Sequence, residues 1–166
     1  MPILALVLLP AVAGCGGSSG GSTQSSVGSG QAVSGPGFTF QAPEGWTVKR
    51  LPTSAEARQD SSTLVSVNVL PLVKPYRFAL FPRVAKELDR VASAYATNLK
   101  GTVTSRRTVE IAGRKARQYE IAHGDLVDRI AFLLRAKRNY QLTCRWRSTD
   151  GEPAACAQLA ASFAFR

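Results

Sequence analysis

Residues 16–37 set the first limit on what this chain can fold into. The segment reads GGSSGGSTQSSVGSGQAVSGPG and contains no charged residue and almost no large side chain. It cannot bury enough apolar surface to offset the entropy lost on ordering. A Gly/Ser chain of this length has a root-mean-square reach of about 25 Å. We therefore predict a flexible linker over residues 15–37, followed by one folded domain over residues 38–166.

The residues before this linker have the pattern of an export signal. Residues 3–13 are nearly all aliphatic, but this run is far shorter than the roughly 20 residues of a membrane-spanning helix. It ends in Val12-Ala13-Gly14-Cys15, which resembles the lipobox of bacterial lipoproteins, although no Lys or Arg precedes it. The resemblance implies that residues 1–14 are a signal peptide and that Cys15 becomes the acylated first residue. The alternative is a buried N-terminal strand.

An acylated Cys15 would place the protein on the extracytoplasmic side of the cell membrane, held there by its lipid anchor. Two cysteines then remain, Cys144 and Cys156, and leftover cysteines in an exported protein most often bond to each other. Closing this loop would stabilise the fold by roughly 3 kcal/mol. A redox or metal site is the alternative, but the two cysteines lack C-x-x-C spacing and a nearby His.

Strands and one clear helix are predicted in the first half of the domain. Phe38–Gln41 and Trp46–Val48 alternate around a Pro43-Glu44-Gly45 turn, which predicts a hairpin. Residues 56–62 are polar and predict a loop, and residues 63–70 predict a strand. Apolar residues recur at helical spacing from Pro82 to Lys100, with Gly101 at the C′ position.

Four strands with short connections follow, at residues 102–111, 114–122, 126–136 and 140–146. Their turns fall at Ala112-Gly113, at residues 123–125 and around Arg138-Asn139. Such short connections require antiparallel neighbours. A short helix from Pro153 to about Ala161 and an apolar tail at 163–165 complete the chain. The sequence therefore predicts an α+β fold, an antiparallel meander flanked by one long and one short helix.

These features resemble the Mog1/PsbP-like domain, and more narrowly the actinobacterial lipoproteins that carry one. The resemblance rests on Phe38-Thr39-Phe40, on Pro43-Glu44-Gly45-Trp46, on the long helix before a meander, and on Ser162-Phe163 after a short helix. It implies a docking module at most, because proteins with this fold share no catalytic motif that can be placed on this chain.

Catalytic motifs are not evident in the sequence. The single histidine, His123, lies in a His-Gly-Asp turn that predicts an exposed side chain. Residues 38–166 contain no G-x-S-x-G elbow, and we find no P-loop, dinucleotide-binding or H-E-x-x-H motif. We therefore predict a protein that is not an enzyme and has no cofactor and no metal.

Basic residues dominate the second half of the domain. The net charge is +10, and residues 100–147 contain twelve Lys or Arg against four acids. Strand alternation suggests that Arg129 and Arg135 converge with Arg145 and Arg147 in a binding patch. Anionic lipid or a wall polymer is the expected polyanion, and nucleic acid is not expected outside the cytoplasm. Solvated strand faces are the alternative.

A second candidate is the aromatic segment from Lys74 to Pro82, with Tyr76, Arg77 and Phe78 as possible binding residues. It could form a protein-binding patch or a pocket lip, or it could pack as satellite core. The predicted function is a non-catalytic binding or accessory module of the cell envelope, with an envelope protein as a further possible partner. The alternative is a carrier or sensor of a small hydrophobic ligand between helix and sheet.

Overall fold

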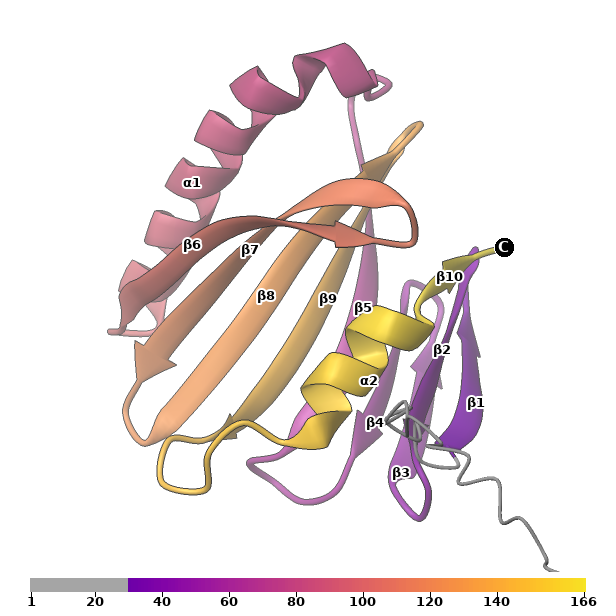
Figure 1. The fold of residues 1–166 in the computed structure, drawn as a ribbon, viewed down its shortest axis with the longest axis vertical. Helices are drawn as coiled ribbons and strands as arrows, with labels where there is room; N and C mark the ends of the chain where they lie inside the picture. Colours follow the sequence, from indigo (N-terminus) through magenta and orange to yellow (C-terminus); the bar gives the residue numbers. More distant parts are fainter. Residues whose placement is uncertain (1–29) are drawn as a thin grey trace, which may run out of the picture.

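A computed structural model describes residues 30–166. The predicted signal peptide and Cys15 lie outside the described residues. The described part contains two antiparallel sheets and two α-helices, so the predicted α+β class is confirmed (Figure 1). No helix within residues 30–166 combines the length and the hydropathy needed to cross a membrane.

The main sheet has seven strands in the order β3-β4-β5-β9-β8-β7-β6. Its strands are β3 (Thr47–Leu51), β4 (Ser54–Arg58), β5 (Leu64–Pro71), β6 (Thr102–Ile111), β7 (Arg114–His123), β8 (Leu126–Arg135) and β9 (Arg138–Arg147). The predicted meander is confirmed as β6 to β9. The prediction of a polar loop at residues 56–62 is wrong for residues 56–58, because they belong to β4, which pairs with β3 and β5.

Two-residue turns fix the register of the meander. Ala112 and Gly113 join β6 to β7 with positive φ at both residues, as a right-twisted hairpin requires. Ala136 and Lys137 join β8 to β9, with a φ of 50° at Ala136. The turn predicted around Arg138-Asn139 is therefore two residues too late, and Arg138 already belongs to β9.

A small sheet of three strands packs beside the main one. It consists of β1 (Gly30–Gly35), β2 (Phe38–Pro43) and β10 (Ala164–Phe165), with β2 in the middle. The predicted hairpin of residues 38–48 is wrong, because β2 pairs with β1 and β10 while β3 pairs with β4. The predicted linker also extends too far, because Val33 in β1 is fully buried.

Helix α1 (Phe81–Asn98) lies across one face of the main sheet. Its buried residues Leu88 and Ala92 pack with Tyr119, Ile121 and other side chains of that face. The helix ends in a Schellman motif, but the left-handed C′ residue is Lys100 (φ 55°) rather than the predicted Gly101. Gly101 is the next residue, and it has no room for a side chain because a Cβ there would lie 2.5 Å from the Ala122 carbonyl oxygen.

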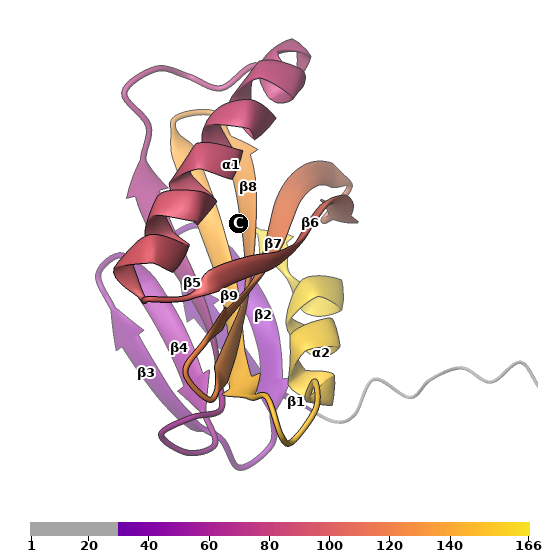
Figure 2. The same ribbon diagram turned by 90° about the vertical axis from the view of Figure 1, so that its left-hand side faces the viewer.

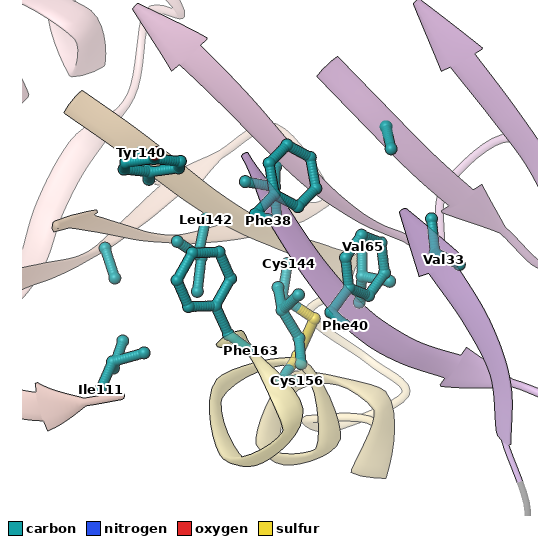
Figure 3. Close-up of a cluster of buried hydrophobic side chains, with 14 of the residues drawn as sticks. Val33, Phe38, Phe40, Val65, Ile111, Tyr140, Leu142, Cys144, Cys156 and Phe163 are labelled. Atoms are coloured by element: carbon teal, nitrogen blue, oxygen red, sulfur yellow. A yellow bond between two sulfur atoms is a disulfide. The ribbon is translucent and has the colours of Figure 1, made fainter. Parts of the chain in front are cut away.

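Helix α2 (Ala154–Ser162) lies on the opposite face of the main sheet from α1 (Figure 2). The predicted disulfide between Cys144 and Cys156 is present and joins this helix to β9 (Figure 3). The larger core forms around it, where Phe38 and Phe40 of the small sheet meet Leu142 of the main one. The two faces of the sheet therefore carry separate cores.

Candidate anion-binding site

The register of β8 and β9 separates the four arginines of the predicted patch. Asp128 is directly opposite Arg145, and Arg129 is opposite Cys144. Paired residues share a face of the sheet and alternate residues lie on opposite faces. Arg129 and Arg135 therefore lie on the face covered by α2, while Arg145 and Arg147 lie on the face covered by α1. The expected convergence of these four residues is wrong.

Arg129 is neutralised inside the fold. Its Nη2 donates to Glu120 Oε1 at 2.6 Å, and its other guanidinium nitrogens bond to Glu120 and Glu152. The guanidinium also stacks over Trp146, with 5.5 Å between its carbon and the ring centroid. These contacts join β7, β8 and the segment before α2, so Arg129 has a structural role.

Arg145 is also paired, with the most buried acid among the described residues. Asp128 is 0% exposed and accepts hydrogen bonds of 2.6 and 2.7 Å from Arg145, which raise the pKa of the guanidinium. His123 Nε2 lies 3.2 Å from Asp128 Oδ2, and its side chain is only 11% exposed. The prediction of an exposed turn histidine is therefore wrong. Arg147 lies nearby, bonded to Ser62 Oγ at 3.1 Å and 3.4 Å from Asp125.

Arg135 lies at the other end of β8 and lines an open concavity of about 340 Å³. We call this feature the basic concavity; its lining residues are Arg135, Ala136, Lys137, Arg138, Tyr140 and Arg166. It forms because the two-residue turn after β8 brings Lys137 and Arg138 next to the C-terminal strand. Four of its six lining residues carry a positive charge.

No Asp or Glu side chain within residues 30–166 pairs with these charges. None of the four cations of the basic concavity forms an ion pair there. Arg135 and Arg138 are directly opposite each other across the strand pair, an arrangement that is unfavourable for like charges. A bound anion would relieve this repulsion.

Aromatic rings hold two of the arginine side chains in position. The guanidinium carbon of Arg135 lies 4.7 Å from the centroid of Phe165, and that of Arg114 lies 5.9 Å from the same centroid. Stacking of this kind stabilises a guanidinium without neutralising it. At Gly37, φ is +82° and a Cβ would lie 2.5 Å from Arg138 Nη1, so this turn leaves room for the Arg138 side chain.

The aromatic segment predicted as a second candidate lies beside the basic concavity. Tyr76 N–H donates to the Ala136 carbonyl at 2.7 Å, and Leu72 N–H donates to the Lys137 carbonyl at 2.9 Å. Tyr76 is half-buried against the α1 core, and burial raises its pKa. Arg77 and Phe78 are exposed. The structure therefore brings Arg135 and this segment to one end of the sheet, but Arg129, Arg145 and Arg147 to other places.

A second open concavity, of about 390 Å³, shares Lys137 and Arg138 with the first. Its remaining lining residues are mainly apolar: Pro36, Pro52, Thr53, Val69 and Pro71. The two basic side chains therefore have an apolar hollow on one side and a cationic hollow on the other. A ligand with both an anionic and an apolar part matches these two adjoining concavities.

The sequence-based prediction missed Lys137, Arg138 and Arg166 of the basic concavity. The misplaced turn put Arg138 in a loop, and Arg166 reaches the site through a tertiary contact, in which its backbone N–H donates to the Gly37 carbonyl at 3.0 Å. One sequence feature could have found the first two, because residues 129–149 contain five basic residues besides Arg129 and no acid. The chemistry of the lining is that of anion binding, with guanidinium and ammonium donors.

The chain matches no family model and no curated protein by sequence. By structure, it is similar to the cyanobacterial PsbP protein (CyanoP) of Synechocystis sp. PCC 6803. That match has a TM-score of 0.60 and 12% identity, and covers 82% of this chain and 92% of that one. A solved protein of Bacteroides thetaiotaomicron matches with a TM-score of 0.58, also at 12% identity, over 82% of this chain and 48% of its own. These likenesses show the fold alone, and the predicted PsbP-like fold is confirmed.

Proposed function

We propose that this chain is an extracytoplasmic lipoprotein, related to the actinobacterial lipoproteins with a PsbP-like domain, that acts as a non-catalytic binding module of the cell envelope. Acylation of Cys15 would tether the domain to the membrane. The binding surface would be the basic concavity. One observation carries the proposal: its four cations form no ion pair within residues 30–166, whereas Arg129 and Arg145 are each bound by carboxylates.

The carrier alternative has less support. The space between α1 and the sheet is filled by buried side chains, among them Leu88, Tyr119 and Phe132. A small pocket between α2 and the sheet has a volume of about 10 Å³, enough for about one water molecule. A hydrophobic ligand would have to displace core side chains in either place.

Binding can be tested with polyphosphate, a soluble polyanion. Charge reversal by Lys137→Glu/Arg138→Glu should weaken polyphosphate binding to the full chain at least tenfold, measured by calorimetry. The matched control is Arg106→Glu/Arg107→Glu on β6. These two adjacent exposed arginines bond to Ser93 and Gln118 and form no ion pair within residues 30–166. Both variants change the net charge equally. Equal weakening by the two variants would contradict the proposal.

The anchor needs a separate test. We expect the mass of the native protein to show a chain that begins at an acylated Cys15. A Cys15→Ser variant should leave the membrane fraction. A native chain that retains residues 1–14 without acyl groups would contradict the lipoprotein assignment, whatever the polyanion result.

A further inference from the structure

Apolar side chains are exposed beside the basic concavity. Six large hydrophobic residues are exposed within residues 30–166, and four of them lie between the end of β5 and the start of α1: Leu70, Val73, Phe78 and Leu80. Val73 is 98% exposed and Phe78 is 58% exposed. We call residues 70–80 the apolar loop. Its hydrogen bonds to the carbonyls of Ala136 and Lys137 hold it against the β8–β9 turn, and Figure 1 shows both at one end of the sheet.

Basic residues lie within the apolar loop and directly after it in the sequence. Residues 70–86 include Lys74, Arg77, Arg83 and Lys86, and no acid. The Lys115 ammonium lies 5.7 Å from the centroid of the Phe78 ring. Exposed apolar side chains together with Lys and Arg are typical of surfaces that lie at a membrane interface, where the apolar groups enter the acyl region and the cations meet headgroups.

We propose that the apolar loop and the basic concavity together dock on the anionic phospholipid surface of the membrane that carries the lipid anchor. The inference rests on the proposed function, because the anchor supplies the membrane. A bilayer offers both chemistries that this end of the molecule presents, phosphate headgroups for the cations and an acyl phase for Val73 and Phe78. A wall polymer offers the charge without the apolar phase.

The length of the chain outside the structure is compatible with this docking. Gly30 is at the far end of β1 from Pro36, which lines the apolar hollow, a distance of about 20 Å along the strand. Residues 15–29 can span at most about 50 Å. The basic end can therefore reach the bilayer that holds the acyl chains of Cys15. Docking would add a second point of attachment to the lipid anchor and would fix the orientation of the domain on the bilayer.

The test measures binding of the full chain carrying Cys15→Ser to lipid vesicles, so that no acyl group contributes. We expect at least about tenfold tighter binding to phosphatidylglycerol-containing vesicles than to pure phosphatidylcholine, since each cation near an anionic surface contributes about fivefold. Lys137→Glu/Arg138→Glu should remove at least tenfold of the affinity. The control Arg106→Glu/Arg107→Glu should change it less than threefold.

The apolar contribution has its own matched pair of variants. Val73→Ser/Phe78→Ser should weaken binding to anionic vesicles about tenfold. Leu51→Ser/Val91→Ser, which alters two exposed apolar residues elsewhere, each 51% exposed, should change it less than twofold. Equal effects of the two pairs would overturn the inference.

Failure of this inference is distinct from failure of the proposed function. If the chain binds polyphosphate through Lys137 and Arg138 but does not prefer anionic vesicles, membrane docking is overturned and a polymer or protein is the partner of the binding module. If it binds neither probe, both are overturned.

Discussion

Arg129 and Arg135 lie on the same strand and the same face of the sheet, six residues apart, but their surroundings differ. Arg129 is bound by Glu120 and Glu152 and stacks on Trp146. Arg135 stacks on Phe165, is directly opposite Arg138, and forms no ion pair with a described residue. The first residue connects parts of the fold, and the second faces an open concavity.

The same difference separates the two ends of the sheet. Around the β7–β8 turn, arginines meet carboxylates, and Asp128 is buried between Arg145 and His123. Around the β8–β9 turn, the cations of the basic concavity lie together, and none of them forms an ion pair with an Asp or Glu of the described residues. A high net charge alone does not locate a binding surface. The pairing of each charge inside the fold separates cations that stabilise it from cations free to bind an anion.

The largest effect is expected at the buried acid. Asp128→Asn should lower the free energy of unfolding by about 3 kcal/mol, because it leaves Arg145 without its carboxylate partner. Arg135→Gln at the other end should change it by less than about 0.5 kcal/mol. Chemical denaturation measures both. Similar losses in the two variants would remove the distinction between paired and free arginines.

The disulfide should stabilise the half of the molecule that holds the paired charges. Cys144 is directly opposite Arg129, and Cys156 lies in α2. Replacing both cysteines with Ala should lower the free energy of unfolding by about 2–3 kcal/mol, since the unfolded chain regains the entropy of the closed loop. The denaturation midpoint of the oxidised chain compared with this variant measures it. An unchanged midpoint would show that α2 is held by packing alone.

A pH-dependent contribution is expected from the ion pair that fastens α1. Asp89 is bonded to Arg117 Nε at 2.9 Å and to the Tyr119 hydroxyl at 2.7 Å. Burial acts to raise the pKa of Asp89, but these hydrogen bonds outweigh it and hold the pKa below its ordinary value of 3.8.

The carboxylate of Asp89 therefore stabilises the fold fully above about pH 4, and this stabilisation is lost as the pH falls through the lowered pKa. Asp89→Asn should cost about 1 kcal/mol at neutral pH and progressively less below pH 4. Urea denaturation of both proteins across this range tests it. A cost that does not change with pH would show that the charge of Asp89 contributes nothing.

The smallest effect concerns the backbone at the basic end. Ala136 has a φ of 50°, a conformation that disfavours residues with a Cβ. Ala136→Gly should raise the free energy of unfolding by about 0.5 kcal/mol, and it should leave polyphosphate binding unchanged because no charge is altered. Destabilisation would show that the Ala136 methyl contributes packing to this turn.

Local patterns predicted the parts of the fold that depend on local physics. The α1 stripe around Leu88 and Ala92 and the meander follow from spacing within short segments. The pairing of Cys144 with Cys156 was predicted by elimination, because they are the two cysteines that remain once Cys15 is assigned to the lipid anchor. The partner of β2 did not follow from spacing, because Phe38–Gln41 alternates equally well beside β3 or beside β1, and only tertiary packing decides. Val33 in β1 gave too little apolar signal among the glycines and serines around it.

The candidate site was predicted in part for a similar reason. Alternation correctly placed Arg129 and Arg135 on one face of β8. It does not predict which residues of β9 share that face, because this depends on the register between the two strands. The turn at Ala136-Lys137 decides that register. Glu152 neutralises Arg129 through a contact between residues that are distant in the sequence. The number of charges in a segment therefore could not show that Arg129 is paired and Arg135 is not.

The most direct test of the central claim maps polyphosphate binding on the unaltered chain by amide chemical shifts. We expect the largest changes in residues 135–140 and smaller ones in residues 70–80, and we expect the amide shifts around Asp128 and Arg145 to stay unchanged. The largest changes around the paired arginines, with residues 135–140 unaffected, would contradict it.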